Sequence, residues 1–190
     1  MAFRLSTIRR RLKPERRLDR LARRVDRELP FADPKRLPPG AAVLLDTCVY
    51  LDTAADRLPD EVAALLARSV LHHSSVCLAE LTYGLGALDP RDRRSRANGR
   101  VIEDMVTRIQ DTGRIVVPDD VAWATAGMLA GMLARLQGYG AGQRRKALLD
   151  SLLFLSALRS GLTLLTANLA EFDLMLQLLP APRVAFYRAA

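Results

Sequence analysis

The sequence is poor in cysteine, histidine and aromatic residues, and each scarcity excludes a class of protein. Its two cysteines, Cys48 and Cys77, cannot supply a disulfide framework, so we expect a chain that works in a reducing cytoplasm. Two cysteines and two histidines also show no zinc-finger spacing. No apolar run reaches the ~18–20 residues of a membrane-spanning helix. The start, Met1–Lys13, lacks the apolar stretch of a secretory signal, so we expect no membrane partner.

Basic charge is abundant, but it is concentrated in one part of the chain. The 190 residues are 49% hydrophobic and carry a net charge of +8, a composition that fits a folded domain with an appendage. Residues 1–40 hold 13 Lys and Arg against 5 Asp and Glu, whereas residues 41–190 hold 16 of each kind. The basicity therefore belongs to the N-terminal segment and does not by itself indicate that the rest binds nucleic acid.

We divide the chain into a basic helical extension with a proline-rich linker, residues 1–40, and a single larger domain, residues 41–190. Residues 1–30 are predicted to form a basic amphipathic helix, whose apolar positions near helical spacing are Leu18, Leu21, Val25 and Leu29. Pro30–Gly40 is the linker. Such a helix docks on the body or on a partner, binds RNA phosphates, or lies on a membrane surface.

In the larger domain, predicted strands alternate with predicted helices. The strands are expected at Val43–Leu45, at the start of Val76–Leu88 before it becomes a helix, and at Arg114–Val117, Leu162–Thr166 and Arg183–Tyr187. Further helices are expected over residues 60–68, 101–110, 119–137, 144–160 and 171–179, with loops over 89–99 and 138–142. This alternation predicts an α/β fold with a parallel sheet and helices on both of its faces.

Acidic and other polar side chains stand at or just after the predicted ends of the buried strands. In an open α/β sheet the working site lies beyond the carboxyl ends of the strands, so these positions should converge. The positions are Asp46, Glu80, Thr166 and Asn168, joined by Asp150 in an apolar helix. A lone buried acid also serves to cap a helix or to pair with an arginine. Three carboxylates within ~4 Å would repel one another by several kcal/mol, and Mg²⁺ or Mn²⁺ would relieve that repulsion.

Four short stretches carry these residues in a characteristic order. They are Leu44–Val49 around Asp46, Ala79–Gly84 around Glu80, Leu148–Ala157 around Asp150, and Leu162–Phe172 around Thr166, Asn168 and Glu171. Together they resemble the four motifs of the PIN-domain ribonucleases, and most of all the VapC-type toxins of toxin–antitoxin pairs. The resemblance covers about residues 42–187 and leaves the N-terminal 40 residues outside it.

The resemblance implies a Mg²⁺- or Mn²⁺-dependent endoribonuclease on a five-stranded parallel sheet with strand order 3-2-1-4-5. It implies a PIN-like three-layer fold, the toxin role of a type II toxin–antitoxin pair, a cognate antitoxin partner, an RNA substrate and a homodimer. The catalytic positions that it implies are Asp46, Glu80, Asp150 and Asn168, the first three being the metal ligands. Thr47 and Thr166 would hold the carboxylates by hydrogen bonds. Asn168 stands where the family often has Asp, and Glu171 would substitute for it.

Basic residues precede Asp150 by four to six positions. Arg144, Arg145 and Lys146 are expected in the first turn of their helix, where they would bind RNA phosphates or simply be solvated. Cys48 and Cys77 flank acids but are expected to be small buried residues. Two other functions stay open. One is a catalytically weak or inactive PIN-scaffold module that binds RNA or protein, and the other is a hydrolase of small phosphoesters.

Overall fold

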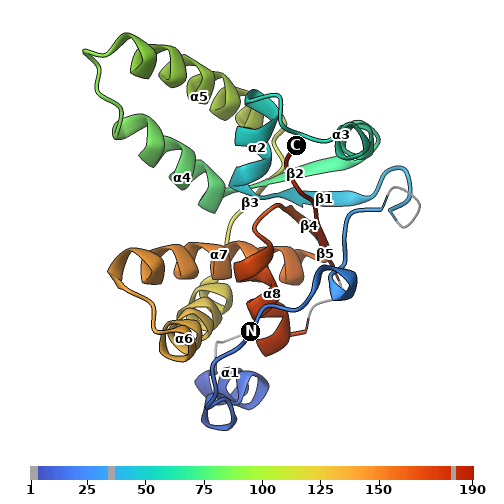
Figure 1. Cartoon of the computed structure of the whole chain (residues 1–190), viewed down its shortest axis with the longest axis vertical. Helices are drawn as coiled ribbons and strands as arrows, with labels where there is room; N and C mark the ends of the chain where they lie inside the picture. Colours follow the sequence, from blue (N-terminus) through green and yellow to red (C-terminus); the bar gives the residue numbers. More distant parts are fainter. Residues whose placement is uncertain (1–3, 34–36, 181–182) are drawn as a thin grey trace.

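The structure, a computed structural model, describes residues 4–33, 37–180 and 183–190. It is built around a parallel sheet of five strands in the order β3-β2-β1-β4-β5 (Figure 1). The strands are β1 Ala42–Leu45, β2 Val70–Ser74, β3 Ile115–Val116, β4 Thr163–Thr166 and β5 Val184–Phe186. The predicted α/β class and strand order are therefore confirmed.

The sheet is covered on both faces, because alternate residues of each buried strand point to opposite sides. Leu44 and Leu164 belong to the larger core, which includes residues of α6 (Asp120–Gln137), α7 (Ala141–Ser160) and α8 (Leu169–Leu178). Val43 and Leu45 belong to the smaller core, together with residues of α2 (Thr47–Ala54) and α3 (Asp60–Ala67). Helices α4 (Ser75–Gly86) and α5 (Arg93–Asp111) form a hairpin that projects from the sheet (Figure 1).

The N-terminal segment is only partly helical, so the single helix predicted for residues 1–30 is wrong. Helix α1 covers Leu5–Leu12 and ends at Lys13, whose φ of 51° is left-handed. Pro14 follows, and proline supplies no amide hydrogen for a continuing helix and clashes with the preceding turn. Two 3-10 turns, η1 Pro14–Arg16 and η2 Asp26–Glu28, interrupt an otherwise irregular path. Residues 1–3 lie outside the described part of the chain.

Residues 13–33, which we call the N-terminal strap, lie along the domain. Leu29 of the strap is buried in the larger core, as are Ile8 and Leu12 of the preceding helix α1. Further on, Ala32 N donates to Phe186 O over 2.7 Å, and Phe186 N donates to Pro30 O over 2.9 Å. The strap thus joins β5 before the predicted linker ends, although residues 34–36 of that linker are outside the described residues. The domain division between residues 40 and 41 stays a prediction.

Several predicted element boundaries are wrong, and side-chain caps account for most of them. The second strand is Val70–Ser74, not the start of 76–88, because Ser74 accepts a bond from Val76 N and begins α4. Asp92 accepts from Ser95 N, so α5 includes most of the predicted loop 89–99. Helix α2, which Asp46 caps, was not predicted. In the described part of the chain, no helix has both the length and the apolar character to cross a bilayer.

Candidate active site

Asp46 lies where β1 ends and α2 begins, and its side chain is 5% exposed. Its Oδ1 accepts a hydrogen bond from Thr47 N over 2.6 Å. Its Oδ2 accepts one from Thr166 Oγ1 over 2.6 Å and a weaker one from Cys48 Sγ over 3.2 Å. Thr166 reaches Asp46 because β4 is paired with β1 and both strands end at the same edge. The carboxylate is therefore fixed in orientation by three donors.

Glu80 approaches the same place from α4. Thr47 Oγ1 donates to Glu80 Oε2, so the residue after Asp46 connects the two acids. Cys77 lies one helical turn before Glu80 and is buried, with its thiol donating to Leu45 O over 3.4 Å. Ligand atoms of Asp46, Cys77 and Glu80 all lie within 4.8 Å of one another. The spacing of three residues to Glu80 is the sequence signal that points Cys77 to the site, although the sequence favours a small buried residue at this position.

Asp150 enters from α7 and is 5% exposed. Asn168, the N-cap of α8, donates from Nδ2 to Asp150 Oδ2 over 3.2 Å. Asn168 N in turn donates to Thr166 Oγ1 over 2.9 Å, so Thr166 contacts the groups around both Asp46 and Asp150. Asp150 is not one of the three residues whose ligand atoms lie within 4.8 Å. It is close enough, however, for the charges of Asp46 and Glu80 to raise its pKa.

The three acids form no ion pair in the described chain, and the pKa of each is raised. Burial raises the pKa of Asp46 and of Glu80, and burial followed by the charge of Asp46 raises the pKa of Asp150 to about 8. Lys146 lowers all three pKa values without forming an ion pair. Within the described residues, arginines pair with other aspartates: Asp26, Asp52, Asp119 and Asp173. Asp46 does cap α2, but the alternative of arginine pairing fails for this cluster.

This donor set fits a hard divalent cation. Mutually repelling carboxylates are the ligands that Mg²⁺ and Mn²⁺ accept, and a bound cation would offset both their repulsion and their burial. Burial raises the pKa of the Cys77 thiol well above its usual value, with the Asp46 charge adding to the effect. A neutral thiol is a poor metal ligand, so oxygen atoms dominate the cluster.

Glu171 stands at the margin of the site. Tyr139, only 8% exposed, contacts both of its carboxylate oxygens from the hydroxyl, at 2.9 and 2.8 Å. The charge of Glu171 is among those that raise the pKa of Asp150. Glu171 also lies in the first turn of α8, three residues after Asn168. Tyr139 falls in the predicted glycine-rich loop, and nothing in the sequence connected it to a residue 32 positions away.

A groove of about 510 Å³ opens beside Glu80, between α4 and the start of α7. Its lining includes Tyr83, Arg145 and Lys146, and the Arg145 guanidinium carbon lies 4.9 Å from the centre of the Tyr83 ring. Helix α7 begins at Ala141, so the basic triplet spans its first and second turns, not the first alone as predicted. Arg144 Nε donates to Tyr139 O over 2.8 Å.

Comparisons with known proteins show the fold. No family model and no curated protein matches the sequence. The crystal structure of FitAcB from Neisseria gonorrhoeae is similar, with 21% identity and a TM-score of 0.52, over 77% of this chain and 96% of that chain. VapBC from Salmonella typhimurium, bound to DNA, has 22% identity and a TM-score of 0.47, over 78% and 98%. VapBC2 from Rickettsia felis, bound to a promoter DNA fragment, has 19% identity and a TM-score of 0.46, over 78% and 99%. The chain has the PIN-like fold. The rest of this chain, beyond the 77% that is covered, has no counterpart in the FitAcB chain.

Proposed function

We propose that the protein is a metal-dependent endoribonuclease that cleaves RNA phosphodiester bonds. One observation carries the proposal: ligand atoms of Asp46 and Glu80 lie within 4.8 Å of each other, the charges of both raise the pKa of Asp150, and no arginine or lysine forms an ion pair with these three acids in the described chain. Such a cluster suits a Mg²⁺ or Mn²⁺ ion. The motif resemblance supplies the reaction class, and the fold shared with FitAcB supports the scaffold.

Each polar residue of the site has a role in this reaction. Asp46, Glu80 and Asp150 would hold Mg²⁺ or Mn²⁺, and the bound ion would supply an activated water and neutralise charge on the phosphodiester. Thr166 and Thr47 fix the orientation of two of these carboxylates by donating to them. Asn168 orients Asp150 through its amide nitrogen and completes the catalytic set without adding a charge. Glu171, held by Tyr139, supplies an acid near the position where Asn168 lacks one.

The groove beside Glu80 suits the RNA strand. Lys146 and Arg145 line it and provide positive charge for phosphates next to the scissile bond. Tyr83, which is 62% exposed, offers an aromatic face on which a base stacks. Arg144 keeps free donors for a phosphate after its Nε has bound Tyr139 O, so its predicted role in RNA binding is retained.

The biological setting of the proposal rests on the motif resemblance. Because the four motifs resemble those of VapC-type toxins, we propose that the chain is the toxin of a type II toxin–antitoxin pair acting in the cytoplasm. A cognate antitoxin protein would then hold it inactive. The homodimer implied by the same resemblance stays a prediction, which the molar mass in solution tests.

Cleavage of RNA by purified protein tests the proposal. Full-length protein with Mn²⁺ should cut a structured RNA internally, and chelation of the metal should stop the reaction. Asp46→Ala should abolish cleavage, whereas the control Asp52→Asn should retain it, because Asp52 lies on the helix that Asp46 caps but bonds to Arg57 and Tyr187. Equal cleavage by wild type and Asp46→Ala would show that the activity comes from elsewhere.

A second function has one observation in its favour. Asn168 donates a hydrogen bond to Asp150, whereas an acid at position 168 would repel Asp150. The site therefore has one negative charge fewer, which suits a module that binds RNA or protein with weak or no catalysis. Such a module would bind RNA with the affinity of a nuclease but leave it intact in Mn²⁺. Hydrolysis of an aryl phosphate without cleavage of RNA would instead indicate a hydrolase of small phosphoesters.

A further inference from the structure

We infer that the N-terminal segment forms a second RNA-binding surface, which holds phosphates away from the cleavage site. The inference rests on the proposed function in taking RNA as the ligand. It begins from charge: most basic side chains of this segment are exposed. Those with no ion pair to any acid in the described chain are Arg4, Arg9, Arg10, Arg11, Lys13, Arg16, Arg17, Arg20 and Arg27. We call this set the basic face.

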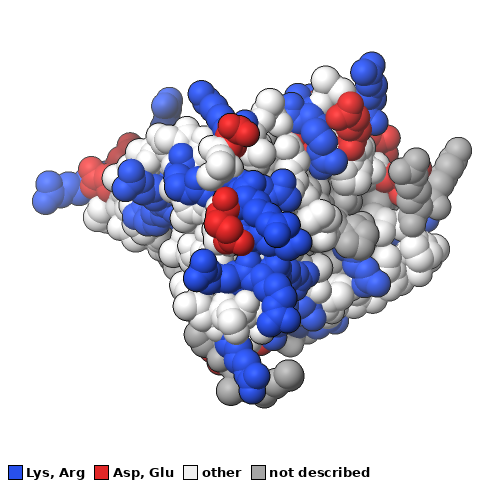
Figure 2. Space-filling view, turned by 90° about the horizontal axis from the view of Figure 1, so that it is seen from below, with Lys and Arg blue, Asp and Glu red and all other residues white. Residues whose placement is uncertain are grey.

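Basic side chains gather on one side of the molecule. Figure 2 views the molecule from the side on which α1 lies in Figure 1, and Lys and Arg form a broad band there with few acidic groups between them. Among the described residues of the segment, the basic side chains that form ion pairs are Arg23, which contacts Asp26, and Arg24, which contacts Asp173. Exposed cations in such a group are attracted to a polyanion, because each phosphate contact releases counterions.

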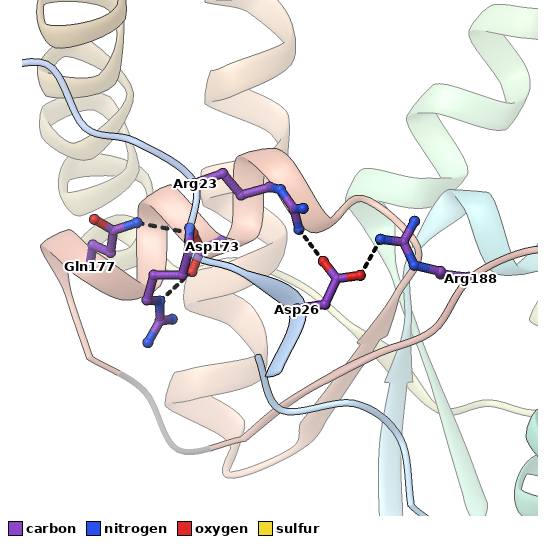
Figure 3. Close-up of polar contacts among 6 residues, drawn as sticks. Arg23, Asp26, Asp173, Gln177 and Arg188 are labelled. Atoms are coloured by element: carbon purple, nitrogen blue, oxygen red, sulfur yellow. Dashed lines mark hydrogen bonds and ion pairs between the residues drawn. The ribbon is translucent and has the colours of Figure 1, made fainter. Parts of the chain in front are cut away.

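The strap that carries part of this face is held in place by side chains of the domain. Arg135 Nη2 donates to Pro14 O over 3.1 Å and to Arg17 O over 2.8 Å. Gln137 Nε2 donates to Leu21 O over 3.1 Å, and Gln177 Nε2 to Ala22 O over 2.9 Å. Figure 3 shows that the Asp26 carboxylate accepts hydrogen bonds from Arg23 and Arg188 on two sides, and that Gln177 donates a hydrogen bond to Asp173. The cations are therefore displayed on a fixed backbone, which reduces the entropy lost on binding.

The basic face leads to the margin of the active site. Arg20 Nε donates to Gln137 Oε1 over 3.3 Å, at the C-terminal end of α6. The positive charge of Arg20 also acts on Tyr139, where it lowers the phenol's pKa against the larger raising effects of burial and Glu171. Tyr139 itself donates to Glu171 beside the acidic cluster. An RNA strand bound near Glu80 and Lys146 can thus continue along α7 and α6 onto the strap.

The apolar residues of the segment favour RNA over a lipid surface. A helix that binds membranes exposes an apolar face, but Ile8 and Leu12 of α1 are buried in the larger core. The exposed apolar side chains nearby are single ones, Leu5 and Leu18 among them. The charged residues are arginines above all, and arginine binds phosphate oxygens in a bidentate manner.

Binding without cleavage tests the inference. The full-length chain carries Asp46→Asn, no divalent ion is present, and fluorescence anisotropy reports binding of labelled mixed-sequence RNAs of about 40 and about 6 nucleotides. The test variant adds Arg9→Gln, Arg10→Gln, Arg16→Gln and Arg17→Gln. The matched control adds four equivalent changes on the α4–α5 hairpin: Arg91→Gln, Arg93→Gln, Arg94→Gln and Arg100→Gln. Both sets remove the same charge from exposed side chains.

We expect the test variant to bind the long RNA about tenfold more weakly and to lose roughly 3 units of salt slope, about 0.7 per phosphate contact. Its affinity for the short RNA should change less than twofold, and the control should bind both RNAs like its parent. Equal losses in test and control would show an effect of net charge and overturn the inference. A different result would assign the basic face to membranes and overturn the inference. In that case the parent would bind phosphatidylserine vesicles, the test variant would not, and both would bind RNA equally well. If wild type does not cleave RNA but the strap dependence holds, the proposed nuclease fails and the binding surface stands.

Discussion

Thr166 Oγ1 donates a 2.6 Å hydrogen bond to Asp46 Oδ2, although 120 positions separate the two residues. They meet because β1 and β4 are neighbouring parallel strands that end at the same edge. The same hydroxyl oxygen accepts a hydrogen bond from the backbone N–H of Asn168. One buried side chain therefore fixes the orientation of the first acid relative to the start of α8.

Replacing Thr166 with valine should weaken metal binding while leaving the shape of the site unchanged. Removing a donor that orients a metal ligand typically lowers affinity or activity about 10–100-fold. Titrating Mn²⁺ into the RNA cleavage reaction should therefore show a raised requirement for Mn²⁺ in Thr166→Val. Thr166→Ser, which keeps the hydroxyl, should resemble wild type. An unchanged Mn²⁺ dependence in the valine variant would mean that Asp46 is oriented without this bond.

The raised pKa of Asp150 predicts a pH-dependent effect of Asp150→Asn on metal-free protein. Its folded pKa of about 8 lies above the usual value of 3.8, so the folded state binds the proton more tightly than the unfolded state. The stability contributed by protonated Asp150 is complete below about pH 4 and is lost as the pH rises to about 8. Asp150→Asn should thus be more stable than wild type at pH 8 by about 1 kcal/mol or more, or ~2–4 °C in Tm. Thermal unfolding with a chelator at pH 5 and pH 8 measures this, and a pH-independent difference would contradict it.

A divalent cation should stabilise the folded protein through the acidic cluster. A ligand present at 100 times its Kd adds about 2.7 kcal/mol to the free energy of unfolding. Mn²⁺ should therefore raise the Tm of wild type at pH 8 and raise that of Asp150→Asn much less, because one charged ligand is missing. Asp52→Asn lacks an acid that pairs with Arg57 outside the cluster, and it should keep the full Mn²⁺ response. Equal Mn²⁺ shifts in all three proteins would place the metal elsewhere.

Tyr83 should contribute to RNA affinity without contributing to stability. Alanine substitution of an aromatic residue that stacks on a base costs about 1–3 kcal/mol of binding free energy. Tyr83→Ala should consequently bind RNA roughly 5–150-fold more weakly, and Tyr83→Phe should bind nearly as wild type does. The Tm should not change, because the side chain is 62% exposed. Weak binding by the phenylalanine variant as well would show that the hydroxyl matters more than the ring.

Asp173 should control the attachment of the strap. It is fully buried and accepts from Arg24 N over 2.8 Å, from Arg24 Nε over 2.6 Å and from Gln177 Nε2 over 3.0 Å. Asp173→Ala leaves these donors unsatisfied and should cost about 1–3 kcal/mol of stability. Trypsin should cut the strap faster in this variant. The more exposed Asp26 provides the control, since Asp26→Asn breaks only ion pairs on the surface. Equal trypsin sensitivity in both variants would show that Asp173 does not control the attachment of the strap.

The sequence predicted the sheet well because the strand signals are local. Val43–Leu45 is a short apolar run that ends in an acid, and the parallel arrangement then placed Asp46 near Thr166 and Asn168 at one edge. The strand β2 was misplaced because it contains two histidines and a serine, which conceal its apolar character. Helix α2 was missed because its first turn holds the β-branched and polar residues that favour strands or turns.

Contacts between residues far apart in the chain could not be predicted from the sequence. The strap follows its path because Arg135 and Gln177 bind its carbonyl groups, and these partners lie more than 110 positions away. Helical spacing of leucines in residues 18–29 suggested a helix instead, but Leu18 proves to be 74% exposed. The contact of Tyr139 with Glu171 likewise depends on how α6, α7 and α8 pack, which no local pattern specifies.

The pairing of residues 30–32 with β5 also bears on how copies of the chain associate. An unpaired outer strand of a sheet invites a strand from another molecule, which leads to fibrils or swapped dimers. Here Pro30 and Ala32 already bond to Phe186, so backbone groups on that side are occupied by the chain itself. On the opposite side, β3 has only two residues. Self-association of this protein should therefore proceed through helix surfaces, and the sheet should resist templated growth.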